Sequence, residues 1–161
     1  MIIAWLCATA LAADHELYGA GHVDGHQSDQ ALGVGAGAKI GYRRHLGPHT
    51  VGGSVFVGDF QWMVGTVELE AGRTLRSQGY RPWLGVEAVG WLGTYAIASA
   101  AHPDPWRGPA VSVRLAARPL VFETRSGLVV SALEVSYGQG LEALGHSASA
   151  AVTVLSLGKA W

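Results

Sequence analysis

Nine charged side chains stand at alternate positions within the apolar stretches of this 161-residue chain. They are Lys39, Arg43, Glu68, Glu70, Arg81, Glu87, Arg114, Arg118 and Glu134. Five are cationic and four are anionic, so the set is almost neutral. If they share one buried face they must pair, because an unpaired buried ion costs several kcal/mol. We therefore predict an ion-paired network, and we weigh against it a narrow ion or proton path lined by the same charges.

Two groups of histidine and aspartate have the residue types of a metal site. They are His22, Asp24, His26 and Asp29 in one predicted loop, and His102 with Asp104 in another. Imidazole and carboxylate groups are zinc ligands, but solvated loop residues of these types are far commoner than ligands. From this spacing we predict no metal and no cofactor.

A third group has the residue types of a hydrolase, since Glu142, His146 and Ser147 supply an acid, a base and a nucleophile. Such groups must lie within hydrogen-bond reach of one another. Adjacent residues of a strand point to opposite faces, so His146 and Ser147 could meet only in a loop. We predict that the protein is not an enzyme, and we keep a lipid-modifying hydrolase as the less favoured alternative.

The clearest of the elements that would position these residues is a hairpin over residues 111–137, with a polar turn at 123–127. In its first strand Val113 and Leu115 share one face, and Arg114 lies on the other. A period of two over this length is typical of β-strands. Each strand is about twice the usual soluble length. This length and this alternation predict a membrane-spanning barrel hairpin.

The composition supports a membrane barrel and excludes two other classes. Hydrophobic residues make up 49% of the chain and charged residues only 14%, whereas soluble domains carry about 25% charged residues. No run of 18 apolar residues follows the first twelve positions, which excludes a helical membrane protein. A formal net charge of −1 and the lack of a basic stripe argue against nucleic acid as a partner.

The first residues predict a secretory signal. A short apolar run, 2–8, is followed by the small-x-small pattern Ala10-Leu11-Ala12. We predict a signal peptide over 1–12 and a barrel domain over 13–161, and the alternative is a buried first strand or helix. The single cysteine, Cys7, would leave with the signal.

From His15 onward the chain divides into eight alternating segments. They are 15–23, 31–44, 50–58, 62–75, 80–98, the two strands of 111–137, and 149–161. Short links at 46–49, 77–79 and 124–127 alternate with longer ones at 24–30, 100–108 and 138–146, although the link at 59–61 is short where a long one is expected. Short turns at one end and long loops at the other are typical of outer-membrane barrels.

Aromatic residues gather near the predicted strand ends, as an interfacial girdle requires. The predicted girdle residues are Tyr42, Trp62, Tyr80, Trp106, Tyr137 and Trp161. Trp83 and Trp91 differ, because simple alternation places both inside with Glu87. Either the interior is packed with indoles or a bulge shifts the register.

In this pattern the chain resembles the small eight-stranded outer-membrane barrels, the OmpA- and OmpX-like group. The resemblance covers residues 13–161 and includes the ending Leu155, Leu157, Trp161, which is similar to the terminal aromatic signature of such proteins. It implies an up-and-down barrel inserted in the outer membrane. The lipid A deacylase family carries His and Ser two residues apart on its next-to-last strand, whereas the comparable strand here, 133–137, has no histidine.

We therefore predict an all-β protein with a single up-and-down antiparallel transmembrane β-barrel of about eight strands, in the bacterial outer membrane. Its predicted role is structural or interactive, with a plugged, ion-paired lumen. Its predicted partners are outer-membrane lipid and envelope proteins that contact loops 24–30, 100–108 and 138–146. The alternative is a secreted soluble lipocalin-like barrel that binds a small apolar ligand. The membrane barrel turns Val113, Leu115, Leu69 and Val86 outward, and the soluble barrel packs them inside.

Overall fold

The computed structural model describes residues 15–28, 32–59, 63–75, 79–95, 106–107, 110–140 and 147–161. The predicted signal segment, residues 1–12, lies outside these ranges. No helix among the described residues is long and apolar enough to cross a membrane. Their regular structure is entirely β.

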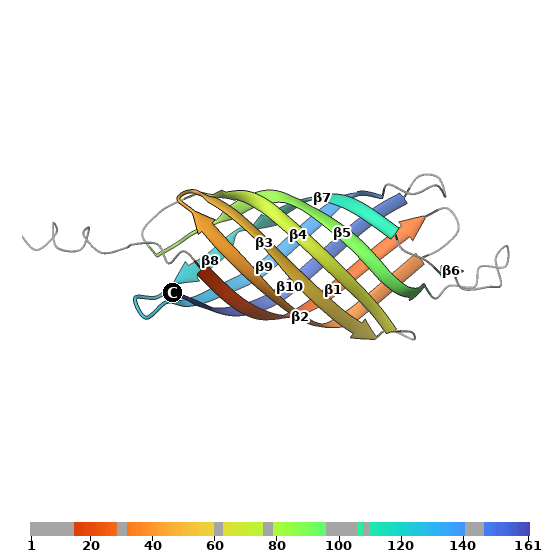
Figure 1. The fold of residues 1–161 in the computed structure, drawn as a ribbon, viewed down its shortest axis with the longest axis horizontal. Coiled ribbons are helices and arrows are strands. Elements are labelled where there is room, and N and C mark those ends of the chain that lie inside the picture. The colour runs from red at the N-terminus through yellow and green to blue at the C-terminus, as the bar shows by residue number, and fades with distance from the viewer. Residues whose placement is uncertain are drawn as a thin grey trace, which may run out of the picture.

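The strands follow one another around a closed sheet. Their bounds are β1 His15–Ser28, β2 Leu32–Leu46, β3 His49–Asp59, β4 Met63–Thr74, β5 Trp83–Tyr95, β6 Trp106–Arg107, β7 Ala110–Arg118, β8 Leu120–Glu123, β9 Leu128–Gly140 and β10 Ser147–Ala160. Successive long strands pair antiparallel, and β10 pairs with both β9 and β1, which closes the barrel (Figure 1). The short β6 pairs only with the end of β5.

Strands β7 and β8 form one wall strand that is interrupted at Pro119. Ala117 pairs with Val135 on β9, and Leu120 pairs with Ala132, so the register continues across the interruption. Proline has no backbone N–H to give to the ladder, which explains the break. Counted this way, the described chain builds an eight-stranded up-and-down barrel.

A bulge in β10 adjusts the register against β1. Gly21 pairs with Leu155 and His22 pairs with Thr153, which leaves Val154 as the extra residue. Val154 and Leu155 are both exposed. Because the bulge absorbs one residue, Thr153 faces the interior beside His22.

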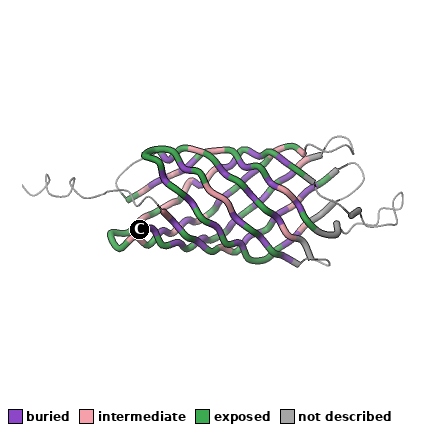
Figure 2. The backbone as a smooth tube through the Cα atoms, viewed as in Figure 1, coloured by how far each residue is buried: buried purple, intermediate pink, exposed green. Residues whose placement is uncertain are grey.

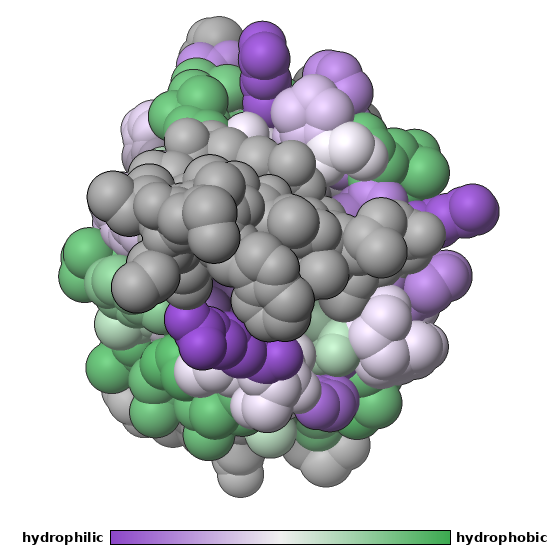
Figure 3. Space-filling model, turned by 90° about the vertical axis from the view of Figure 1, so that its left-hand side faces the viewer, coloured by the Kyte–Doolittle hydropathy of each residue, from purple (hydrophilic) through white to green (hydrophobic). Residues whose placement is uncertain are grey.

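The outer surface of the barrel is apolar and its interior is charged. The four positions that separate the two sequence hypotheses, Val113, Leu115, Leu69 and Val86, are 46%, 70%, 64% and 45% exposed. Buried and exposed residues alternate along the long strands (Figure 2), and the alternation shifts by one residue at Ala132-Leu133 in β9 and at Val154-Leu155 in β10. Seen from one end, hydrophobic side chains lie around the circumference (Figure 3). This arrangement is the one expected of a membrane barrel and the opposite of the lipocalin-like alternative.

The links 47–48 and 124–127 and the described residues of 75–82 lie at one end of the barrel, together with His15 and Trp161, whose backbones hydrogen-bond to each other. We call this the turn end and the opposite end the loop end. Strand β5 begins at Trp83, three residues later than predicted, and Tyr80 instead forms an isolated bridge to Phe122.

The predicted loop 24–30 is wrong over residues 24–28, because β1 continues to Ser28. Asp24 and His26 are buried strand residues whose side chains face the interior. The outward positions Gly25 and Gln27 are not apolar, so the alternation carried no hydrophobic signal there. Residues 138–140 of another predicted loop belong to β9, and 106–107 form β6. The remaining residues of the three predicted loops lie outside the described ranges.

Candidate functional site in the barrel interior

All nine charged residues singled out in the sequence are buried. Five strands, β2, β4, β5, β7 and β9, carry eight of them at inward positions of the alternation, and Arg81 directly precedes β5. Glu16 and Asp24 of β1 join them there. The sequence analysis did not name Glu16 and placed Asp24 in a loop, although Glu16, Tyr18, His22, Asp24 and His26 stand at even-numbered positions and could have been recognised as one polar face.

Arg43 is the centre of the cluster toward the turn end. Its Nε donates to Glu70 Oε1 (2.7 Å), Nη1 donates to Glu16 Oε1 (2.9 Å), and Nη2 donates to Glu134 Oε2 (3.4 Å). The guanidinium also lies 3.5 Å from the centre of the Tyr18 ring. One fully buried arginine therefore connects three carboxylates from three other strands.

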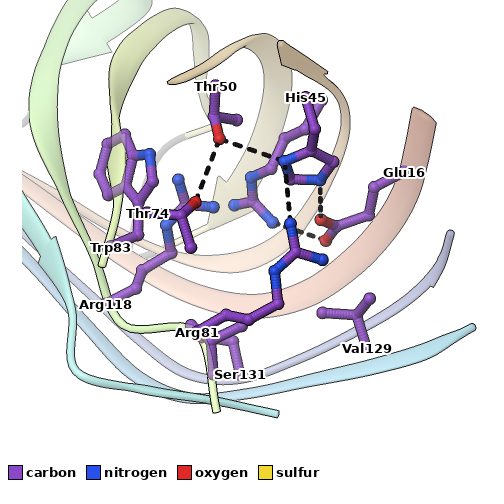
Figure 4. Close-up of a pocket in the computed structure, with 11 residues that line it drawn as sticks. Glu16, His45, Thr50, Thr74, Arg81, Trp83, Arg118, Val129 and Ser131 are labelled. Carbon is purple, nitrogen blue, oxygen red and sulfur yellow. Dashed lines mark hydrogen bonds and ion pairs between the residues drawn. The ribbon is translucent and has the colours of Figure 1, made fainter. Parts of the chain in front are cut away.

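A small pocket lies beside this cluster (Figure 4). His45 is held there between Thr50 Oγ1, 3.1 Å from Nδ1, and Glu16 Oε2, 3.2 Å from Nε2. Arg81 Nη2 lies 3.5 Å from His45 Nδ1, and Arg81 Nη1 pairs with Glu123. Glu16, His45 and Thr50 on the pocket wall are thus joined by hydrogen bonds.

In the middle of the barrel the anions are shared between cations. Lys39 Nζ pairs with Glu68 and lies 3.4 Å from Glu134 Oε1. Arg118 lies 3.2 Å from Glu70 Oε1 and 3.5 Å from Glu134 Oε2, with its guanidinium 3.8 Å from the centre of the Trp83 ring. Glu87 is buried with them, but its Oε1 accepts no hydrogen bond among the described residues.

The cluster nearest the loop end is built on Asp24 and Arg114. Arg114 donates from both Nη atoms to the two carboxylate oxygens of Asp24, with an Nη1–Oδ2 distance of 3.0 Å. Its Nε donates to Ser149 Oγ (2.6 Å), which also accepts a hydrogen bond from Ser112. This bidentate geometry is the strongest type of arginine–carboxylate contact.

Two residues of the predicted aromatic girdle, Tyr42 and Trp161, lie at the turn end, and their side chains are exposed. His15 joins them, because its Nδ1 hydrogen-bonds to the Tyr42 hydroxyl and its ring stacks on Trp161 at 6.0 Å. Tyr137 is exposed near the other end of β9, and Tyr80 is half-buried beside Phe122. Trp62 and the side chain of Trp106 lie outside the described residues.

Trp83 and Trp91 are buried in the lumen, and the pairings of β5 with β4 and β7 contain no register shift. Of the two alternatives given in the sequence analysis, the structure therefore shows an interior packed with indoles and not a bulge in β5. Of the hydrolase group, Glu142 and His146 lie outside the described residues, as does the side chain of Ser147, which begins β10.

No protein-family model matches the chain, and no curated protein does. Solved structures do resemble it. Neisserial surface protein A is 7% identical, with 92% of this chain and 98% of that protein covered and a TM-score of 0.63. The N-terminal β-barrel domain of OprF from Pseudomonas aeruginosa is 14% identical, with 91% and 98% covered and a TM-score of 0.59. Ail, the attachment invasion locus protein of Yersinia pestis, solved with the heparin analogue sucrose octasulfate, is 15% identical, with 91% and 97% covered and a TM-score of 0.53.

At these identities the likeness shows the fold. The predicted fold class, a single up-and-down antiparallel barrel of eight strands of the outer-membrane type, is confirmed, as is the resemblance to the small outer-membrane barrels. The bacterial outer membrane is the location predicted from the sequence and the location that these neighbours share.

Proposed function

We propose that this protein is an integral barrel of the bacterial outer membrane, with a lumen closed by ion pairs and a structural or loop-mediated interaction role. The observation that carries the proposal is the separation of the side chains into an exposed aliphatic outer surface and a buried charged interior. An arginine at the middle of the lipid-facing surface would cost about 2–4 kcal/mol. This cost favours a chain that turns its aliphatic residues toward acyl chains.

The closed lumen is supported by the density of contacts inside the barrel. The interior of an eight-stranded barrel is only wide enough for side chains to fill. Arg43 and Arg114 are 2% and 1% exposed, and each donates at least three hydrogen bonds to residues of other strands. A continuous ion path would require these pairs to separate.

Fractionation and gel mobility test the location. We expect the protein to pellet with outer membranes, to require detergent for extraction, and to migrate differently in gels before and after boiling. We also propose that residues 1–12 are removed, so the membrane form should begin at Ala13. Recovery of a monomer that stays soluble without detergent would contradict the proposal.

Conductance in planar bilayers tests the closed lumen. The wild-type protein should show no steady ion conductance, because side chains fill its interior and buried ion pairs join the strands across it. Reproducible, ion-selective current steps that change in the Arg43→Ala variant would show that the lumen is an ion path and is not closed.

We assign the interaction role to the loop end because the longest stretch of sequence between two barrel strands, residues 96–109, connects β5 to β7 at that end. Residues 29–31, 60–62, 96–109 and 141–146 together contain one arginine, no lysine and three acids. This charge gives no support for a sulfated ligand of the kind bound to Ail. We therefore favour neutral or basic envelope proteins as partners. Cross-linkers at Leu144 should capture such a partner in intact envelopes and cross-linkers at Ser126, in a turn at the opposite end, should not. Equal capture at both positions would argue against the assignment.

A further inference from the structure

Three buried side chains converge between the middle cluster and the loop-end cluster of the lumen. His22 Nε2 lies 3.5 Å from Asp24 Oδ2 and 3.6 Å from Glu68 Oε1. The donor atoms of the three residues all lie within 4.8 Å of one another. His22 and Asp24 share the inward face of β1, and Glu68 reaches them from β4.

His22 Nε2 has no hydrogen-bond partner among the described residues, although the side chain is only 2% exposed. Its other ring nitrogen, Nδ1, lies 2.7 Å from Thr153 Oγ1. If Nδ1–H donates to that hydroxyl, Nε2 presents a lone pair toward both carboxylates. A buried nitrogen lone pair directed at two anions is unfavourable on its own and favourable when a cation lies between them.

Two of the three distances between the donor atoms match the edges of a tetrahedral metal site. Zinc binds imidazole nitrogen and carboxylate oxygen at about 2.0–2.2 Å, which sets the edges of a coordination tetrahedron at about 3.3–3.6 Å. The two distances from His22 Nε2 fall at the upper end of that range. A small movement of Glu68 or Asp24 would complete the third edge.

The charge of the interior also favours a cation. Among the described residues six carboxylates are buried, Glu16, Asp24, Glu68, Glu70, Glu87 and Glu134. Only five lysines and arginines are buried with them, Lys39, Arg43, Arg81, Arg114 and Arg118. The excess negative charge is therefore enclosed in the same volume as the three donors.

We propose that His22, Asp24 and Glu68 form a binding site for one divalent transition-metal ion, of which Zn²⁺ is the best match. Lys39 pairs with Oε2 of Glu68, whereas Oε1 faces His22. Arg114 uses one lone pair on each oxygen of Asp24, and each oxygen keeps a second. Thr153 orients the imidazole, and the bulge at Val154 brings Thr153 to that position.

The test is Zn²⁺ binding by the full chain, refolded in detergent micelles after removal of metals with a chelator, in competition with a chromophoric zinc indicator. The wild-type protein should bind one Zn²⁺ per barrel. His22→Gln should weaken binding at least tenfold. The matched control is His26→Gln, which replaces the next inward histidine of the same strand and should bind like wild type. No binding by wild type, or equal binding by the two variants, would overturn the proposal.

A second variant keeps the test decisive if His22→Gln does not refold. Thr153→Val keeps the shape of the side chain and removes the hydroxyl that orients His22. Loss of such a support weakens metal binding about 10- to 100-fold. Co²⁺ bound to wild type should give the intense visible absorption of tetrahedral coordination, and the variant should lose it at the same Co²⁺ concentration. A weak octahedral spectrum, identical in the two proteins, would also refute the site.

Discussion

Removing one partner of an interior ion pair should lower the free energy of unfolding, because the other partner stays buried, and Arg43→Met tests this most directly. Methionine keeps most of the length and apolar volume of the stem and removes the guanidinium. The change deletes three hydrogen bonds to carboxylates and the contact with the Tyr18 ring. The three carboxylates stay buried.

The expected loss follows from what each carboxylate retains. Glu70 keeps Arg118, and Glu134 keeps Arg118 and Lys39. Among the residues that the structure describes, Glu16 keeps the contact with His45 alone. Removal of one partner of a buried pair costs about 3–5 kcal/mol. Because two of the three anions remain paired, we expect the variant to lose about 3–5 kcal/mol rather than the sum of three broken contacts.

The measurement is reversible unfolding in denaturant, from lipid vesicles or micelles, followed by tryptophan fluorescence and by gel mobility. Arg44→Met is the matched control, because Arg44 is the next residue of the same strand and its side chain is exposed. A surface substitution of that kind changes stability by about 0.5 kcal/mol or less. In the Arg43→Met/Glu16→Gln double variant, part of the loss should be recovered, since the unpaired charge is gone. Equal stability of the Arg43→Met and Arg44→Met variants would refute the reasoning.

Three further predictions concern the outer surface, the sheet and the hydrolase alternative. Leu115→Arg places a charge near the middle of the lipid-facing surface and should lower the free energy of unfolding in vesicles by about 2–4 kcal/mol. The control, Leu46→Arg beside a turn, should lower it by about 0–1 kcal/mol. Similar losses for the two variants would show that Leu115 does not face the membrane centre. A Cβ on Gly138 would overlap the backbone carbonyl of Val113, whereas a Cβ on Gly90 would make an ordinary contact with the Val67 carbonyl. Gly138→Ala should therefore lower the denaturant midpoint of unfolding by the equivalent of about 1–3 kcal/mol, and Gly90→Ala should lower it by clearly less. The variants His146→Ala and Ser147→Ala should leave the lipid A of cells unchanged by mass spectrometry, and a lost product would restore the hydrolase alternative.

The period of two explains why the fold class and the two faces could be predicted from the sequence. Alternation shows directly which side chains share a face. The outward positions of Leu69, Val86 and Leu115 could therefore be predicted from the sequence alone. It failed where the outward residues were not apolar. In β1 the outward Gly25 and Gln27 hid a strand that continues to Ser28.

The partners within the interior could not be predicted, because they depend on how the strands are staggered around the barrel. Asp24 and Arg114 are 90 residues apart in sequence and come from strands that are not neighbours in the sheet. The alternation predicts that both side chains face inward, but it does not predict where each lies along the barrel axis. The convergence of His22 and Glu68 was missed for the same reason. The bulge at Val154 did leave a signal, since Val154-Leu155 places two apolar residues in succession.

The same charges that fill the lumen also specify the register of the strands. In β2 four glycines alternate with small or aliphatic residues, and a glycine-rich strand holds its register weakly. A slip by one residue would turn Lys39 and Arg43 toward the outside and leave Glu68 and Glu16 without cations. In β7 the same slip would exchange Arg114 with Leu115, at a cost of about 2–4 kcal/mol for the arginine in lipid and a further few kcal/mol for the unpaired Asp24. Replacement of the interior by apolar residues of equal volume could therefore preserve stability and still lose the unique alignment, because nothing would then distinguish the inner face from the outer one.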